Sequence, residues 1–330
     1  MENLRYPLTQ RRYRTSPLMR ELTASVRLSH KQFIIPLFVE EGLSQPREVK
    51  GLPGIQVETA ATVEQAVTKA IQSGINKFLL FPVPAAKQEV VGDFSFAVRT
   101  IRQLKAVFGP EIWLAADCCL CSYTTHGHCG ILDSSLTRML NNASVELISR
   151  YAAELAVAGA DCIAPSDMTD GRIAAIRSRL DALGYDTVSI MSYAAKFSSQ
   201  FYGPFRDACH SAPSAGLSDR KTYQHSPFNR EDAIASALRD DQEGADILMV
   251  KPAALYTDIL LTLKQETRKP LAAYHVSGEY AAVESLAQQG LVSRAAAHLE
   301  VWAALNRAGA AMIISYAAGE ARGWIERMTY

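Results

Sequence analysis

Short apolar runs recur along the chain from residue 32 onward, and each is followed by a stretch whose apolar residues repeat every three or four positions. The run 32–39 (QFIIPLFV) is almost continuously apolar, as in a strand that is covered on both faces. We predict strands over residues 32–39, 76–83, 112–117, 160–165, 186–193, 245–251, 270–275 and 310–316. We predict helices over residues 62–74, 94–107, 144–158, 169–183, 229–243, 254–267, 279–289 and 293–308, with a last short helix after them.

This alternation predicts an α/β protein, because eight short strands that each precede a helix are the count of a (β/α)8 TIM barrel. A weak repeat agrees with it: a helix end, a glycine and an apolar strand recur at residues 158–161, 243–246 and 308–311. An open doubly wound sheet would show a similar alternation, but no strand leads into a Gly-x-Gly-x-x-Gly turn or a P-loop. We expect one catalytic barrel domain over residues 31–330.

The segment 1–30 differs from the rest of the chain. Arg11, Arg12, Arg14, Arg20 and Arg27 are spread through it, and leucine, methionine and valine residues between positions 18 and 28 could anchor it. A disordered tail or a basic arm that binds nucleic acid would also fit this composition. An extended arm that packs on another subunit of a homo-oligomer is the more economical interpretation.

Composition narrows the class of protein. The 330 residues are 48% hydrophobic and carry 34 basic and 34 acidic side chains. A chain with this balance has no global field to attract nucleic acid or an acidic membrane surface. We expect no nucleic-acid partner and no membrane association, since neither a signal peptide nor a membrane-spanning run is recognisable. Six cysteines in a chain of this length do not indicate a disulfide framework, so we expect a cytoplasmic protein.

Four of the cysteines crowd into residues 117–130 (DCCLCSYTTHGHCG), directly after a predicted strand. Cys119, Cys121 and Cys129 have the spacing C-x-C-x7-C, and thiolates are ligands that zinc prefers. Three ligands would leave zinc an open position for catalysis, whereas His126 or His128 could close the site as a structural one. Cys118 alternates away from its neighbours, and Cys162 and Cys209 lie apart from them, so we predict that these three are packing residues.

Two lysines are predicted at the carboxyl ends of neighbouring strands, where barrel enzymes bind substrate. Lys196 follows the fifth strand and Lys251 closes the sixth. Because like charges and a dry surrounding both favour a neutral amine, we predict Schiff-base chemistry with a carbonyl substrate. The other polar residues at strand ends are Asp117, Ser166, Asp167, Ser277 and Tyr316. The long loop 194–228 adds Arg206, Arg220, Lys221 and Gln224, and its arginines suit a carboxylate.

At these residues the sequence resembles the porphobilinogen synthase (5-aminolevulinate dehydratase) family, in its zinc-dependent branch. The motifs are DCCLCSYTTHGHCG, SYAAKF, FYGPFRDA, SDRKTYQ, ILMVKPA and YHVSGEY, and the similarity covers nearly the whole chain. The resemblance implies a lyase of tetrapyrrole (heme) biosynthesis that condenses two molecules of 5-aminolevulinate into porphobilinogen with loss of two waters.

The resemblance also implies residue roles. Lys251 would form the Schiff base with the substrate of the propionate side, and Lys196 with that of the acetate side. Arg206 and Arg220 would pair the carboxylate of the acetate side, and Ser277 and Tyr316 the other. Cys119, Cys121 and Cys129 would hold catalytic Zn²⁺, and Asp117 and Ser166 would line the acetate-side pocket, with Gln224 as a further substrate contact.

Two departures from the family's pattern limit the implied metals. Ser236 stands where many bacterial members have a glutamate ligand for allosteric Mg²⁺, and Arg239 matches an arginine that replaces this ion, so we expect no allosteric magnesium. Thr222 stands where a second zinc site would have a cysteine. The family assembles as a homo-octamer through the N-terminal arm, and a hexamer also occurs.

Two other interpretations compete with this one. A class I aldolase would use a single lysine and no zinc. A non-catalytic zinc-binding barrel would have a closed four-ligand metal and unreactive lysines.

Overall fold

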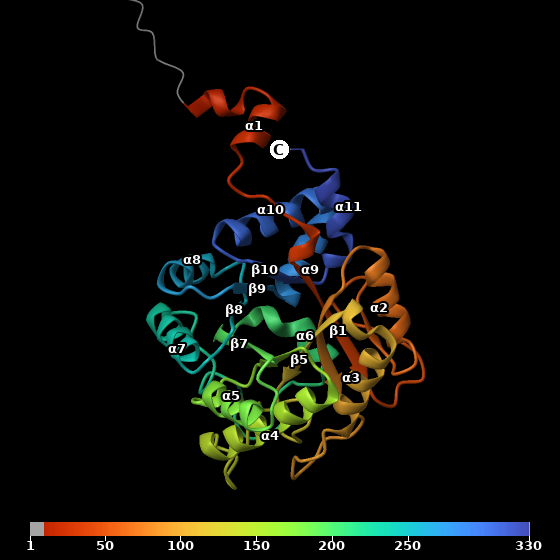
Figure 1. Ribbon diagram of the computed structural model, residues 1–330, viewed down its shortest axis with the longest axis vertical. Helices are drawn as coiled ribbons and strands as arrows, with labels where there is room; N and C mark the ends of the chain where they lie inside the picture. The colour runs from red at the N-terminus through yellow and green to blue at the C-terminus, as the bar shows by residue number, and fades with distance from the viewer. Residues whose placement is uncertain (1–9, 330) are drawn as a thin grey trace, which may run out of the picture.

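Residues 10–329 are described by the computed structural model, and their parallel strands close into a barrel (Figure 1). Each barrel strand pairs with the next along the chain, and the last pairs with the first through Phe33 and Ile313. The barrel strands are β1 (Phe33–Glu40), β4 (Lys77–Val83), β5 (Trp113–Cys118), β6 (Cys162–Pro165), β7 (Ser189–Lys196), β8 (Ile247–Lys251), β9 (Leu271–His275) and β10 (Met312–Ser315). The predicted (β/α)8 barrel is therefore confirmed.

Helices surround the barrel, and each predicted helix is present with ends shifted by a few residues. They are α2 (Val63–Gln72), α3 (Ser95–Phe108), α4 (Asn141–Ala158), α5 (Arg172–Ala182), α7 (Arg230–Gln242), α8 (Thr257–Glu266), α9 (Ser277–Gln288), α10 (Arg294–Arg307) and α11 (Ala321–Glu326). Local chemistry sets the ends: the Asn229 side chain accepts from the Asp232 amide at the start of α7, and Gly159 ends α4 with φ of 108°.

Several elements were not predicted. A short antiparallel pair, β2 (Arg47–Glu48) and β3 (Gln56–Glu58), adds to the edge of β1 beyond the barrel. The loop 194–228 contains the 3₁₀ turn η4 (Gln200–Tyr202) and the helix α6 (Gly203–Ala208), and further 3₁₀ turns are η2 (His30–Gln32), η3 (Gly109–Glu111) and η5 (Ala318–Glu320). Strand β7 runs to Lys196 instead of ending at Tyr193, so Lys196 belongs to the strand.

The N-terminal segment stands away from the barrel, beyond α10 and α11 (Figure 1). It contains η1 (Gln10–Arg14) and α1 (Pro17–Thr23), which begins at the Ser16 cap, and neither element has a buried residue. Residues 1–9 of the expected arm lie outside the described part. Within residues 10–329, no helix has both the length and the apolar character that crossing a bilayer requires.

Candidate active site

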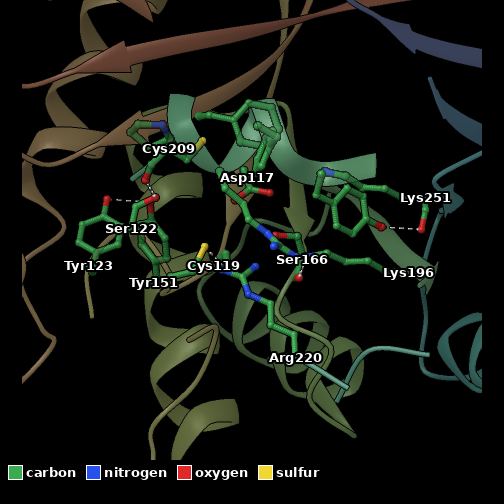
Figure 2. A pocket seen from close by; sticks show the side chains of 16 residues that line it. Asp117, Cys119, Ser122, Tyr123, Tyr151, Ser166, Lys196, Cys209, Arg220 and Lys251 are labelled. Atoms are coloured by element: carbon green, nitrogen blue, oxygen red, sulfur yellow. Dashed lines mark hydrogen bonds between the residues drawn. The ribbon is translucent and has the colours of Figure 1, made fainter. Parts of the chain in front are cut away.

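Side chains from the carboxyl ends of five consecutive barrel strands line one pocket, which the loop after β7 covers. In Figure 2, Lys196 and Lys251 extend from one side toward Asp117 and Ser166, and Cys119 lies on the other side. The predicted residues that line this pocket are Asp117, Cys119, Cys121, Ser166, Lys196, Arg206, Arg220 and Lys251. The barrel thus brings together most of the site predicted from positions spread over 135 residues (117 to 251) of the chain.

Lys251 lies in an aromatic enclosure. Its Nζ is 4.0 Å from the ring centroid of Tyr274, 4.4 Å from that of Phe205 and 4.9 Å from that of Tyr193. Burial first, and then the Lys196 charge, lower the pKa of Lys251 to about 7. Near neutral pH a substantial fraction of this amine is therefore unprotonated and nucleophilic, as the sequence interpretation required.

Lys196 is the register partner of Lys251 on the adjacent strand. Its side chain is buried, and its Nζ donates to the carbonyl of Ser166 at the end of β6. The Tyr193 ring centroid lies 5.4 Å from this Nζ, so one tyrosine ring contacts both amines. The two lysines are thus buried neighbours in one pocket, as their predicted strands indicated.

Asp117, at the end of β5, provides a carboxyl group between the lysines and the cysteines. Burial raises its pKa to about 6, against the opposing effect of the Lys196 and Lys251 charges. Its Oδ1 is shielded from solvent and has no hydrogen-bond partner among the described residues. A carboxyl group with this pKa and a free oxygen can accept or return a proton near neutral pH.

The three predicted metal ligands form one buried cluster. The Sγ atoms of Cys119, Cys121 and Cys129 lie within 4.8 Å of one another, and the first two are 3.3 Å apart. Hydrogen bonds from the thiols of Cys119 and Cys121 hold the pKa of Cys129 well below its usual value. Three soft sulfur donors without a disulfide fit zinc or a similar ion.

No histidine completes this cluster within the described residues. Both ring nitrogens of His128 contact other groups: Nδ1 lies 2.9 Å from the Tyr223 hydroxyl and Nε2 lies 2.9 Å from the Leu217 carbonyl. The arrangement therefore favours a three-ligand site over a closed one. Cys118 is buried in the hydrophobic core, and Cys162 is buried there too, as predicted. Cys209 is buried as well, but it also lines the pocket.

Both predicted arginines reach the pocket from the loop after β7. Arg220 is buried, and its Nη2 donates to the Gly127 carbonyl at 3.0 Å and to the Ser211 carbonyl. Arg206, on α6, is partly buried, and burial followed by the Arg220 charge lowers its pKa. Two neighbouring guanidinium groups at one pocket suit a carboxylate ligand.

Four predicted site residues lie outside the lining of this pocket: Cys129 of the cysteine cluster, Ser277, Tyr316 and Gln224. Ser277 is buried at the start of α9, where its Oγ donates to the Phe201 carbonyl and accepts from the Phe205 amide, both at 3.2 Å. Tyr316 has its hydroxyl 3.4 Å from that of Tyr274, which encloses Lys251. Gln224 lines a neighbouring hollow together with Ser236 and Arg239.

Sequence reasoning missed the aromatic residues that the barrel contributes, namely Phe81 on β4, Tyr193 on β7 and Tyr274 on β9. Each looks like an ordinary apolar strand residue, and only the closed barrel reveals that they surround Lys251. It also missed Lys87, whose Nζ donates to the carbonyls of Cys121 at 3.4 Å and Thr124 at 3.2 Å. The sequence contains no short motif that links Lys87 to the cysteine loop.

Fold and site together define a barrel enzyme with two buried lysines beside a group of three thiols. Comparison with known proteins agrees. The family model for delta-aminolevulinic acid dehydratase matches residues 8–324. The delta-aminolevulinic acid dehydratase of Bacillus subtilis is 43% identical over 96% of this chain and 97% of its own length, and that of Streptomyces coelicolor is 40% identical over 94% of each.

A solved structure agrees over the whole fold. It is the Toxoplasma gondii delta-aminolevulinic acid dehydratase (porphobilinogen synthase) in complex with the reaction product porphobilinogen, with a TM-score of 0.93 and 37% identity over 98% of this chain and 94% of that one. The chain belongs to the delta-aminolevulinic acid dehydratase family, and it is an enzyme of the hydro-lyase class.

Proposed function

We propose that this enzyme condenses two molecules of 5-aminolevulinate into porphobilinogen through a Schiff base on each lysine. The observation that carries the proposal is the pairing of Lys196 with Lys251, both buried, in one pocket that also receives two arginines. Two amines can each bind one ketone, and arginines suit the carboxylates that the substrates bear. The single-lysine aldolase interpretation leaves the second buried lysine without a role.

Two imines would fix two identical ketones in different orientations. Lys251 would attack the ketone of the propionate-side substrate and Lys196 that of the acetate-side substrate, and each ketone oxygen would leave as water. Holding both substrates turns an encounter of two molecules into a reaction within one complex. Asp117 would then move protons between the reacting atoms, because its free Oδ1 and its pKa of about 6 suit that exchange.

The substrate carboxylates would be held at the two ends of the pocket. Arg206 and Arg220 would bind that of the acetate side. Ser277 and Tyr316 would bind the other after the contacts of Ser277 with residues 201 and 205 rearrange, and Ser166 and Gln224 would complete the polar lining. Closing the loop over both substrates would exclude the water that hydrolyses imines.

Cys119, Cys121 and Cys129 would hold Zn²⁺ at the edge of the pocket. Their buried, closely spaced sulfurs fit this ion, which would supply Lewis acidity beside the substrates. Among residues 10–329 the cluster has three protein ligands, which supports a catalytic zinc with an open position over a structural one. Arg239 donates to Asp170 at 2.7 Å and to Ser236 at 3.2 Å, which supports an assembly that needs no allosteric magnesium.

The experiment is to incubate the protein with 5-aminolevulinate and to detect the pyrrole with an aldehyde reagent, with and without a zinc chelator. We expect pyrrole formation that is lost on chelation and restored by Zn²⁺. Activity that survives complete removal of the metal would preserve the reaction and refute the catalytic zinc. No pyrrole from a zinc-loaded, folded oligomer would refute the proposed reaction.

A further inference from the structure

The strand that carries Lys196 is irregular. In the regular part of the β7–β8 pairing, Ser192 lies opposite Leu248, but farther along Lys196 lies opposite Lys251. Four residues of β7 (196 − 192) therefore span the same length as three residues of β8 (251 − 248). The register shift between Ser192 and Ala195 is a β-bulge that takes up one extra residue.

This extra residue decides where the Lys196 side chain points. With a regular register, Lys196 would lie opposite Pro252, one position beyond Lys251. Side chains alternate between the two faces of a strand, so a slip of one residue turns a side chain to the opposite face. A β7 without the bulge would direct Lys196 toward the surrounding helices, whereas the bulge directs it into the pocket beside Lys251.

A buried ionic network holds this bulge from outside the barrel. Arg172, the first residue of α5, is fully buried and pairs with the equally buried Asp240 of α7 at 2.9 Å. Its Nη2 also donates to the Ser192 hydroxyl at 3.1 Å and to the Tyr193 carbonyl at 3.4 Å. The Ser192 hydroxyl in turn donates to Asp240 at 2.5 Å.

The contacts of Arg172 fall on the residues where the register shifts. A bulge leaves backbone groups without ladder partners, and buried groups of this kind need other hydrogen bonds. The rigid guanidinium fork can satisfy an acidic side chain, a hydroxyl and a carbonyl at once. Arg172, Asp240 and Ser192 do not line the pocket, so they act on the reaction indirectly. They do so through the strand and through Asp167, with which Arg172 also pairs at 3.6 Å and which follows the pocket residue Ser166.

We infer that Arg172, Asp240 and Ser192 are positioning residues that hold the β7 bulge and thereby direct Lys196 into the pocket beside Lys251. The inference rests on the proposed function in that it takes Lys196 as an imine-forming amine. It predicts that loosening the bulge lowers the reactivity of Lys196 selectively. Lys251, on the regular strand β8, stays almost unaffected when trapping is measured at a pH well above its midpoint, where its amine is neutral with or without the Lys196 charge nearby.

The test is reductive trapping. The protein is incubated with 5-aminolevulinate and borohydride, and the labelled lysines are identified by peptide mass spectrometry. Because removing Arg172 or Asp240 would leave an unpaired buried charge, the main variant is Ser192→Ala, with Arg172→Lys as a second one. We expect trapping at Lys196 to slow by about 100-fold, as for a reacting group displaced by about 1 Å, while trapping at Lys251 stays within about twofold.

Two controls separate positioning from a general loss of structure. Ser189→Ala removes a hydroxyl from the same strand, one that donates to the Asp161 carbonyl away from the bulge, and should leave trapping at both lysines unchanged. Ser192→Thr keeps the hydroxyl and should restore Lys196. The inference would be overturned if trapping fell equally at both lysines in the Ser192→Ala and Arg172→Lys variants. It would also be overturned if trapping at Lys196 fell in neither variant. A wild-type protein that traps substrate at neither lysine would instead overturn the proposed function.

Discussion

At the scale of single residues, the pKa of Lys251 is set by neighbours with opposite effects. The charge of Lys196 lowers this pKa and that of Asp117 raises it, while burial accounts for most of the shift to about 7. Removing each neighbour should therefore move the pKa in a different direction. The two variants therefore test whether the neighbouring charges set the reactivity of Lys251.

We predict that the rate of imine formation at Lys251 rises with pH through a midpoint near 7, because only the neutral amine attacks a ketone. Asp117→Asn should shift this midpoint to lower pH, since a group that stabilises the ammonium is lost. Lys196→Met should shift it to higher pH. The measurement is borohydride trapping at Lys251 over a pH series. Midpoints that move in the same direction in both variants would contradict this account.

Lys87 supports the cysteine loop from the segment after β4. Its ammonium group donates to two carbonyls of that loop. Burial lowers the pKa of Lys87, and the nearby Cys121 side chain opposes this lowering. Groups that orient metal ligands in this way commonly change metal affinity by about 10–100-fold when they are removed.

We therefore predict that Lys87→Met weakens Zn²⁺ binding by about 10–100-fold. Competition with a chromophoric chelator measures this affinity independently of turnover. Lys69→Met, which removes an exposed lysine from α2, is the matched control and should bind Zn²⁺ like the wild type. Equal affinity in Lys87→Met and the wild type would show that Lys87 does not support the metal loop.

At the scale of elements, the apolar runs identified all eight barrel strands and their helices, because strands covered on both faces have a strong sequence signal. The β7 bulge left no such signal. The predicted strand ended at Tyr193, since Ala194, Ala195 and Lys196 continue it through contacts with β8 and with Arg172 that lie far away in sequence. The short pair β2–β3 was missed for the same reason: its residues alternate weakly, and pairing with β1 makes them strands.

The candidate site also has features that local sequence patterns predict and features that they do not. The cysteine spacing and the lysines at strand ends are local patterns, and they identified the metal cluster and both amines. No local sequence pattern predicts the aromatic enclosure of Lys251. Phe81, Tyr193 and Tyr274 come from three strands, and only the closure of the barrel determines that their rings face Lys251. Tyrosines in apolar strands are ordinary core residues in most barrels.

The carboxylate of Glu279 connects helix α9 to the loop that follows the strand carrying Lys251. Glu279 Oε1 accepts from the amides of Ala254 at 3.0 Å and Leu255 at 3.3 Å, and Oε2 accepts from Val276 at 2.9 Å. This residue therefore joins the loop after β8 to the start of α9, where Ser277 lies.

We predict that Glu279→Ala destabilises the barrel, because each buried amide that it leaves unpaired costs about 1–3 kcal/mol. Urea unfolding at one protein concentration, followed by tryptophan fluorescence, measures the loss. Glu300→Ala on the exposed side of α10 is the control and should change stability by less than about 0.5 kcal/mol. A Glu279→Ala protein as stable as this control would mean that water replaces the carboxylate.

At the scale of the whole molecule, the N-terminal segment is exposed in a way that an isolated chain does not explain. Leu18 and Leu22 on α1 are 77% and 74% exposed, and α1 extends beyond α10 and α11 without a buried residue (Figure 1). A helix that projects apolar side chains into solvent gains little stability by itself. A second copy of the chain is the natural partner, as an arm that completes a homo-oligomer.

We predict that the full chain assembles into an octamer through this arm, that a chain beginning at residue 30 does not, and that sedimentation velocity detects a smaller species for the shortened chain. Leu18→Glu combined with Leu22→Glu in the full chain should have the same effect, because the proposed interface would then have to bury two charges. Leu291→Glu is the matched control: it charges a residue that is 66% exposed between α9 and α10, outside the arm, and should leave the assembly intact. If the octamer survives both arm variants and dissociates in Leu291→Glu, the subunits associate through the barrel surface and the arm has another role.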